Sequence, residues 1–270
     1  MRASEKLGKV SQLVRFWYLL QHLYLVVDFF VVAFLLKILN PDPITRRHKL
    51  VHNTNRIAHK FLKAFQIELS IENKQRMTNL HDQAYLLVSN HVSYTDIIVL
   101  ACLENMVFIT SVEMGANPFL GAVTRYGGCL YTDRKKPVSL PGEIKKFSQT
   151  IKDGFKVVLF PEGTSTNGRT VKDFRKSLFE VPVKAQCPIL PVCIRYTHLD
   201  GQEITDATRD YICWYGDMTF VPHFMKLLGR KIRAQIEILD PIPVPMQKTR
   251  AELSEAVYGQ IHSSYHKSGV

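Results

Sequence analysis

The pattern of short apolar runs beyond residue 66 constrains the fold more than any other feature of this sequence. Runs typical of strands occur at 84–89, 106–110, 129–132, 156–160, 188–194 and 232–239. Helical stretches occur between or after them, at 95–103, 140–153, 177–185 and 251–266. Strands that alternate with helices in this way are typical of α/β domains. For residues 66–270 we therefore predict an α/β domain with a mixed, largely buried sheet flanked by helices.

The preceding segment, residues 1–65, contains an apolar run from Phe16 to Leu39. As a helix, this run could cross a hydrocarbon core of about 30 Å. It is too long for a cleavable signal peptide. Asp28 in its middle and basic residues on both flanks disfavour an ordinary span. We predict a membrane-seated helix that enters one leaflet and returns through a turn at 40–43, with a plain single span as the alternative.

A second helical pattern follows between residues 45 and 65, where Ile57, Phe61 and Phe65 recur at helical spacing. Arginine and lysine residues supply the polar side of this pattern. A basic amphipathic helix of this kind lies well at an anionic membrane surface. A surface helix packed on its own domain accounts for the pattern equally well, so both interpretations stay open.

Net charge and cysteine content limit the chemistry only coarsely. The formal charge of +11 suits either an anionic membrane or a nucleic acid, and charge alone does not choose between them. The five cysteines are scattered and form no C-x-x-C pair. This spacing favours buried reduced thiols over a disulfide framework or a zinc site, which fits a reducing compartment.

The segment SNHVSYTD, residues 89–96, directly follows a predicted strand. That position places His91 on a loop at the carboxyl edge of the sheet, where open α/β sheets bind ligands. Asp96 falls in the first turn of the next helix, within reach of the imidazole. A histidine oriented by a carboxylate is a candidate general base. The alternative is a carboxylate that merely favours the helix N-terminus and a loop histidine without chemistry.

The segment FPEGTS, residues 160–165, follows another predicted strand and places Glu162 and Gly163 at the same edge. Backbone N–H groups of such a turn can hold a phosphate or an oxyanion, although a tight turn with a buried carboxylate is the simpler interpretation. The overlapping run GTSTNGRT at 163–170 matches the pattern of a nucleotide-binding P-loop at every defined position except one. Arg169 stands where that motif requires lysine, which disfavours a nucleotide hydrolase.

Four motifs, taken together and in order, resemble the four blocks of the glycerolipid acyltransferase family typified by 1-acylglycerol-3-phosphate acyltransferase. They are N-H-x4-D at 90–96, G-G-C-L-Y-T-D-R at 127–134, F-P-E-G-T at 160–164 and C-P-I-L-P-V at 187–192. The resemblance covers roughly residues 80 to 200. It implies that His91 is the catalytic base and that Asp96 orients it. It also implies substrate-binding roles for four residues: Arg134, Glu162, Gly163 and Thr164.

The function that this resemblance implies is transfer of a fatty acyl chain from acyl-CoA or acyl-carrier protein to the free hydroxyl of a lysophospholipid. The first candidate reaction converts 1-acylglycerol-3-phosphate to phosphatidic acid, and acylation of a non-phosphate lipid such as lyso-ornithine lipid is the alternative. We expect membrane lipids and the acyl donor as partners, without nucleic acid, metal or cofactor, at the cytoplasmic face of a membrane. A non-catalytic basic membrane-binding module is the alternative of another class.

Two stretches depart from the family pattern. Ser111 and Val112 precede Glu113 where the family commonly has a lysine, and a missing point charge weakens the case for a phosphate head group. The run WYGDMTFVPH at 214–223 matches none of the four blocks. Its role does not follow from the sequence.

Overall fold

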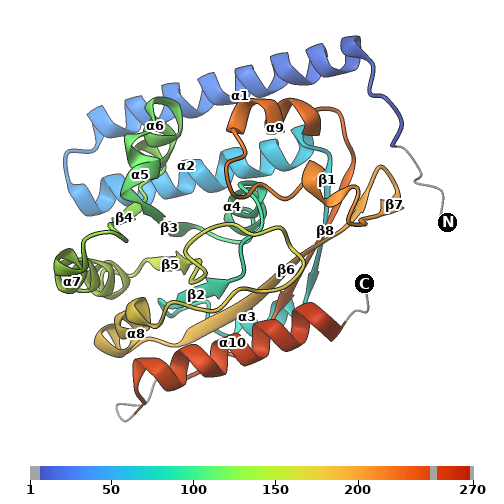
Figure 1. Ribbon diagram of the computed structural model, residues 1–270. Coiled ribbons are helices and arrows are strands. Elements are labelled where there is room, and N and C mark those ends of the chain that lie inside the picture. The colour runs from blue at the N-terminus through green and yellow to red at the C-terminus, as the bar shows by residue number, and fades with distance from the viewer. Residues whose placement is uncertain (1–6, 244–247, 268–270) are drawn as a thin grey trace.

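The computed structural model describes residues 7–243 and 248–267, so residues 1–6 of the predicted N-terminal segment lie outside it (Figure 1). Its strands are β1 (Ile67–Glu72), β2 (Leu86–Ser89), β3 (Met106–Ser111), β4 (Leu130–Thr132), β5 (Lys156–Leu159), β6 (Ile189–Leu199), β7 (Gln202–Glu203) and β8 (Ile232–Ile238). Its α-helices are α1 (Gln12–Leu39), α2 (Pro43–Ala64), α3 (Lys74–Thr78), α4 (Thr95–Ala101), α5 (Val112–Ala116), α6 (Pro118–Tyr126), α7 (Leu140–Lys152), α8 (Glu180–Ala185), α9 (Phe220–Leu227) and α10 (Arg250–Lys267).

The strands form one mixed sheet in the order β1-β8-β6-β2-β5-β3-β4, with the short β7 paired to β6. Strands β6, β2, β5, β3 and β4 run parallel to one another. The reversal comes between β6 and β8, which pair antiparallel, and β1 extends the sheet parallel to β8. The carboxyl ends of β2, β3, β4 and β5 therefore meet at one edge of the sheet.

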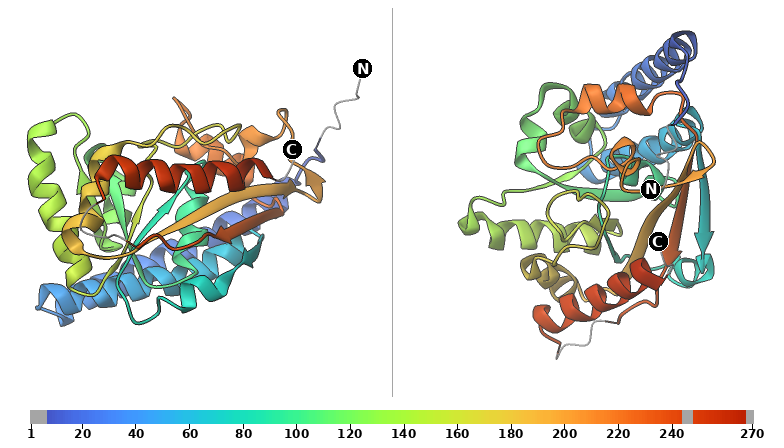
Figure 2. Two further views of the ribbon diagram at one scale, coloured as in Figure 1. Left: turned by 90° about the horizontal axis from the view of Figure 1, so that it is seen from below. Right: turned by 45° about the vertical axis from the view of Figure 1, so that its right-hand side comes forward.

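Helices cover both faces of the sheet and bury a hydrophobic core on each (Figure 2). On one face α7, α8 and α10 pack through residues such as Phe147 and Val257. On the other face α2, α4 and α9 pack through residues such as Ala58 and Leu100. Two covered faces explain why the strands read as continuous apolar runs, and the predicted fold class is confirmed.

Every predicted strand and helix of the α/β domain is present, with ends shifted by a few residues. The stretch 177–185 divides into a 3-10 turn (Lys176–Phe179) and α8. The prediction missed the edge strands β1 and β7 and the helices α3, α5, α6 and α9. Most of these elements are short, and their stability comes from tertiary packing rather than from a strong local pattern.

Helices α1 and α2 form a hairpin, and the predicted turn lies between them at residues 40–42 (Figure 1). Asp42 caps the N-terminus of α2 by accepting the backbone N–H of Thr45 at 2.7 Å, and Pro43 occupies the first helical position. Both features favour a helix start at this point, so the chain reverses abruptly.

Asp28 in the middle of α1 is paired within the protein. Its carboxylate accepts hydrogen bonds from Arg56 at 2.8 and 2.9 Å and from Lys60 at 2.7 Å, both on α2. Only 14% of the Asp28 side chain is exposed. Asp28, which disfavours an ordinary membrane-spanning helix, thus holds α1 against α2.

The apolar face of α2 is buried, since Leu50, Val51, Ile57 and Ala58 pack inside the protein. Helix α2 contacts α1 on one side and α4, β1 and β3 on the other. Of the two interpretations of this basic amphipathic helix, the structure supports packing on its own domain, because no continuous apolar face is left for a membrane.

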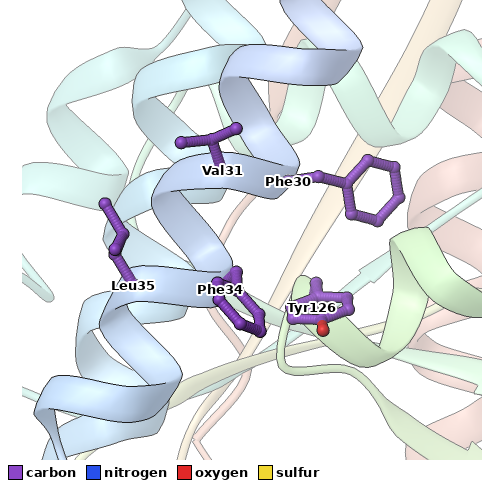
Figure 3. A pocket seen from close by; sticks show the side chains of 5 residues that line it. All are labelled: Phe30, Val31, Phe34, Leu35 and Tyr126. Atoms are coloured by element: carbon purple, nitrogen blue, oxygen red, sulfur yellow. The ribbon is translucent and has the colours of Figure 1, made fainter.

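Helix α1, by contrast, leaves much of its apolar surface exposed. It is the one described helix long and apolar enough to cross a membrane, judged by length and composition. Large exposed side chains recur along it, among them Trp17, Tyr24 and Ile38. Side chains of α1 and Tyr126 at the end of α6 line a shallow groove of about 340 Å³ (Figure 3). The groove residues are Phe30, Val31, Phe34, Leu35 and Tyr126.

Candidate active site

The predicted site residues come from loops that follow parallel strands. His91 follows β2 and Glu162 follows β5, and these two strands are neighbours in the sheet. Arg134 follows β4, two strands further along. A shared strand direction therefore brings segments far apart in the sequence to one edge, as predicted from the ends of the apolar runs.

His91 is held by Asp96, as its position in the sequence predicts. The Nδ1 atom of His91 lies 2.7 Å from Oδ2 of Asp96, which sits in the first turn of α4 and is fully buried. The same Oδ2 accepts the backbone N–H groups of Val92 at 2.7 Å and Ser93 at 2.9 Å. Because two backbone N–H groups already donate to this oxygen, we assign the proton between the two residues to Nδ1 of His91.

This tautomer leaves Nε2 of His91 as the acceptor nitrogen of the ring. Nε2 has no hydrogen-bond partner among the described residues, and 18% of the His91 side chain is exposed. The imidazole stacks on Phe160, with ring centroids 4.1 Å apart and planes inclined by 20°. A ring fixed on one side and open at Nε2 has the geometry of a general base.

Two further residues support this pair, and neither was assigned a role from sequence. The hydroxyl of Tyr196, on β6, donates to Oδ1 of Asp96 at 2.8 Å. The side-chain amide of Asn90 donates to the carbonyl of Ile194 at 2.9 Å and accepts its N–H at 2.8 Å. Asn90 thereby ties the histidine loop to β6. Asn90 belongs to the first motif and could have been noticed, whereas nothing near Asp96 in sequence points to Tyr196.

Glu162 supports the same loop from β5. Its Oε1 accepts the backbone N–H of His91 at 2.6 Å, and its Oε2 accepts that of Lys172 at 2.8 Å. Burial raises the pKa of Glu162 to about 7, against the opposing effect of these two donors, and the side chain is almost fully buried. Glu162 therefore lies beneath the turn and positions His91. This agrees with the simpler interpretation of the FPEGTS segment, a tight turn with a buried carboxylate.

Gly163 lies against a residue that the sequence analysis missed, Arg175. Gly163 has φ +73°, and a Cβ placed on it would lie 2.7 Å from Nε of Arg175. Desolvation of the guanidinium lowers the pKa of Arg134, the charge of Glu113 opposes this shift, and the charge of Arg175 adds to it. Both arginines are exposed. The sequence signal for Arg175 was weak, since it lies in an ordinary-looking basic run.

The remaining predicted residue, Thr164, does not join the others. Its side chain is exposed, and within the described part of the chain its hydroxyl donates only to the neighbouring carbonyl of Ser165, at 3.4 Å. The structure thus joins His91, Asp96 and Glu162 by hydrogen bonds and places Gly163 next to Arg175.

The unassigned run 214–223 lies against both motif loops. The backbone N–H of Trp214 donates to the carbonyl of Val92 at 2.8 Å, and the carbonyl of Trp214 accepts the hydroxyl of Ser165. At the other end of the run, Nδ1 of His223 lies 3.2 Å from the hydroxyl of Tyr94, which belongs to the histidine motif. Residues 214–223 therefore pack against one side of the site.

The resemblance of residues 163–170 to a nucleotide-binding loop has no structural counterpart. A P-loop leads into a helix whose N-terminus faces the phosphates. Here residues 163–175 are irregular, and the carbonyl of His91 accepts the backbone N–H of Thr166 at 2.9 Å. This loop serves to hold the histidine motif.

All five cysteines are free thiols, and Cys187, Cys193 and Cys213 are buried. Burial raises the pKa of the Cys193 thiol to about 11 and that of Cys213 to about 12. Thiols with raised pKa values are poor nucleophiles, so none of these three competes with His91 as the reactive group.

Comparison with known proteins agrees with the motifs. The family model described as Acyltransferase matches residues 67–195, which include all four motifs. The chain is 28% identical over 180 residues to a lyso-ornithine lipid O-acyltransferase of Rhizobium meliloti, covering 64% of this chain and 62% of that protein. It is 33% identical over 177 residues to the enzyme of the same name from Pseudomonas aeruginosa, covering 64% of each chain.

A 1-acyl-sn-glycerol-3-phosphate acyltransferase of Neisseria gonorrhoeae is 27% identical over 122 residues, or 45% of this chain and 48% of that protein. The chain thus spans less than two thirds of the length of these curated relatives. The crystal structure of the 1-acyl-sn-glycerophosphate acyltransferase PlsC from Thermotoga maritima superposes with a TM-score of 0.67, covering 94% of both chains at 18% identity, which shows a common fold. Residues 67–195, which contain all four motifs, thus match the acyltransferase family model, and the loops that follow β2, β4 and β5 bring the residues of three of these motifs to one sheet edge.

Proposed function

We propose that this protein is an O-acyltransferase that moves a fatty acyl chain from a thioester donor to the free hydroxyl of a lyso-lipid. The observation that carries the proposal is the imidazole of His91, whose Nδ1 is held by the buried Asp96 carboxylate and whose Nε2 is open. Such an imidazole can take a proton from a hydroxyl that reaches the sheet edge.

The reaction follows from the position of that proton. Nε2 of His91 accepts the hydroxyl proton while the hydroxyl oxygen forms a bond to the thioester carbonyl carbon. Asp96 balances the imidazolium charge that develops, and Tyr196 and two backbone N–H groups keep the carboxylate in place. The carbon–sulfur bond then breaks, and the leaving thiolate takes the proton from Nε2. The base is restored without a covalent acyl-enzyme or a further co-reactant.

Two acceptors are candidates. Lyso-ornithine lipid is favoured by the names of two relatives that match nearly two thirds of the chain, and by the absence of a lysine before Glu113. 1-Acylglycerol-3-phosphate is favoured by Arg134, which lies at the family position for head-group binding. Both lipids carry a free hydroxyl and an anionic group, so the same base could serve either.

The expected site of action is the cytoplasmic face of a membrane. The exposed apolar surface of α1 supports membrane contact, since residues such as Trp17 and Ile38 would otherwise face water. The free thiols fit a reducing compartment. Acyl-CoA and acyl-carrier protein are the donors expected at that face.

Purified protein in mixed micelles, supplied with labelled acyl-CoA or acyl-carrier protein and a panel of lyso-lipids, tests the proposal. We expect labelled diacyl product from wild type and a loss of two to four decades in rate for His91→Ala, the roughly 10²–10⁴ range typical of general bases. His81→Ala is a matched control, because His81 also pairs with an aspartate, Asp82, at 3.0 Å but is 74% exposed. Unchanged turnover in His91→Ala would exclude this mechanism, and no product with any pair of substrates would favour a non-catalytic membrane module.

A further inference from the structure

The irregular segment 163–175 connects the histidine loop to the C-terminal helix α10. Every residue of this segment is described, and none of them lies in a helix or a strand, so the segment cannot be fixed by regular backbone hydrogen bonds of its own. The N–H of Lys172 donates to Glu162 at 2.8 Å, which holds the later part of the segment against the turn. Its middle, residues 166–168, depends on contacts with other parts of the chain.

The middle of this segment holds the backbone of His91. The carbonyl of His91 accepts the backbone N–H of Thr166 at 2.9 Å and the hydroxyl of Thr166 at 3.3 Å. The N–H of His91 donates to Glu162 at 2.6 Å. Both backbone polar groups of His91 are thus bound by one stretch of chain, so a shift of residues 166–168 would also move the imidazole.

Helix α10 contacts this segment through Tyr265, near the C-terminal end of the helix. The helix runs across β6 on one face of the sheet (Figure 1), and the hydroxyl of Tyr265 donates to the carbonyl of Gly168 at 2.6 Å. Burial raises the pKa of Tyr265 well above its ordinary value, so this hydroxyl stays protonated and remains a donor. The next residue, His266, lies with Nε2 3.1 Å from the hydroxyl oxygen of Thr170.

Gly168 has little room for any other arrangement. Its φ is +68°, and a Cβ placed on it would lie 3.0 Å from Sγ of Cys213, 3.3 Å from the hydroxyl oxygen of Tyr265 and 3.6 Å from Val92. Its N–H donates to the hydroxyl of Thr166 at 3.4 Å. Gly168 is therefore enclosed between α10 and the histidine loop, with its carbonyl bound to Tyr265 and its N–H bound to Thr166.

We propose that Tyr265 is a positioning residue, which holds Gly168 and, through Thr166, the backbone of His91, so that the C-terminal helix sets the position of the base. This inference rests on the proposed acyl transfer. Proton transfer needs Nε2 within hydrogen-bond distance of the attacking hydroxyl, and a displacement of about 1 Å can cost about a hundredfold in rate. Asp96 orients the imidazole, and the segment 162–168 anchors the backbone that carries it.

The test compares wild type with Tyr265→Phe, which removes one oxygen and keeps the ring, using full-length protein in mixed micelles. Tyr258→Phe is the matched control, because it makes the same chemical change about two turns earlier on α10. The ring of Tyr258 packs edge-on against Phe174, with centroids 5.2 Å apart, and its hydroxyl has no hydrogen-bond partner among the described residues. Thermal unfolding checks the fold of each variant.

With saturating acyl donor and acceptor, we expect kcat to fall by about three- to tenfold in Tyr265→Phe, with both KM values unchanged. This is the range for a neutral hydrogen bond whose loss is felt in the transition state. Tyr258→Phe should behave as wild type. The proposal is overturned by an unchanged kcat in Tyr265→Phe, by an equal fall in Tyr258→Phe, or by a change confined to KM.

Thr166→Val removes the hydroxyl at the other end of the connection and provides a second variant. It should also lower kcat, because the carbonyl of His91 and the N–H of Gly168 both lose a partner. If the two residues act through one connection, Tyr265→Phe and Thr166→Val together should lower kcat by less than the product of their separate effects. Effects that multiply fully would contradict a shared connection.

Hydrogen exchange measured by mass spectrometry tests the connection without any catalysis. Peptides that cover 89–96 and 163–170 should exchange faster in Tyr265→Phe than in wild type and in Tyr258→Phe, while peptides of β5 keep the wild-type rate. If wild type acylates no acceptor, this pattern still supports the connection although the proposed reaction has failed. Unchanged exchange at 89–96 refutes the inference, and so does faster exchange that extends to β5, because that marks a general loss of stability.

Discussion

Replacing Asp96 by asparagine separates the charge of this carboxylate from its geometry. Oδ2 of Asp96 accepts three N–H groups, and Oδ1 accepts the hydroxyl of Tyr196. An asparagine can keep its amide oxygen among the three donors and turn its NH₂ toward Tyr196. That hydroxyl can then accept and donate instead to Thr95 Oγ1, which lies 2.7 Å away. We therefore expect Asp96→Asn to retain the fold and the orientation of His91.

The variant loses the negative charge that stabilises the imidazolium. Charged hydrogen bonds exceed neutral ones by about 1–2 kcal/mol, and a unit charge at about 4 Å with an effective dielectric of 20 sets an upper bound of about 4 kcal/mol. A loss of about 2–4 kcal/mol in the transition state lowers kcat by about 30- to 1000-fold. Asp96→Ala is less informative, because it leaves three N–H donors without an acceptor at about 1–3 kcal/mol each and endangers folding.

Initial rates with saturating acyl donor and acceptor give kcat for wild type, Asp96→Asn and His91→Ala, and thermal unfolding checks the fold of each. We expect Asp96→Asn to fall between the other two, with both KM values close to those of wild type. Wild-type kcat in Asp96→Asn would show that the charge contributes nothing. A kcat as low as that of His91→Ala, with an unchanged melting temperature, would show that the imidazole loses its orientation and would refute the assignment of donors.

Three further predictions concern stability and the turn. The pKa of Glu162 is raised from 4.5 to about 7 on folding, so its stabilising contribution is complete below pH 4.5 and decreases by about 3 kcal/mol as the pH rises to 7. Melting temperatures at pH 5 and 8 should therefore differ more for wild type than for Glu162→Gln, and equal differences contradict the assignment. Alanine variants of Asp28 and Arg56, singly and together, should reveal a coupling of about 1–3 kcal/mol in thermal unfolding; a coupling near zero means that the pair does not hold the hairpin. Gly163→Ala should cost about 1–3 kcal/mol of stability, because the residue has a positive φ and its Cβ would meet Arg175, and an unchanged melting temperature would contradict this.

Local sequence was sufficient for the elements that carry the site. Strands covered on both faces appear as continuous apolar runs, and the residue after each run lies at a sheet edge. This placed His91 and Glu162 at the same sheet edge by prediction, whereas the direct pairing of β2 with β5 appears only in the structure. Asp96 lies five residues from His91, in the first turn of the following helix, so its contact with the imidazole is also a local property.

Pairing across long sequence distances was decided only by the tertiary structure. The order of the strands depends on how crossover helices pack, and no apolar run encodes which strand will be its neighbour. The partner of Asp96 on β6 therefore cannot be read from the sequence, because Tyr196 lies 100 residues away, beyond the end of the apolar run at 188–194. The same holds for Arg175, which reaches Gly163 only because the intervening loop is hydrogen-bonded to Glu162.

In the N-terminal segment, too, some features follow from the local sequence and others only from the tertiary structure. Its two apolar patterns and the turn between them are local features, and helix α1, the turn and helix α2 all formed where the patterns place them. Asp28 was recognisable as incompatible with an ordinary span, because an unpaired charge in hydrocarbon is costly. Its pairing with Arg56 and Lys60 depends on how the two helices face each other. A charged residue within an apolar run can be recognised in the sequence as one that needs a partner. Which residue becomes that partner is decided only by the packing of the folded chain.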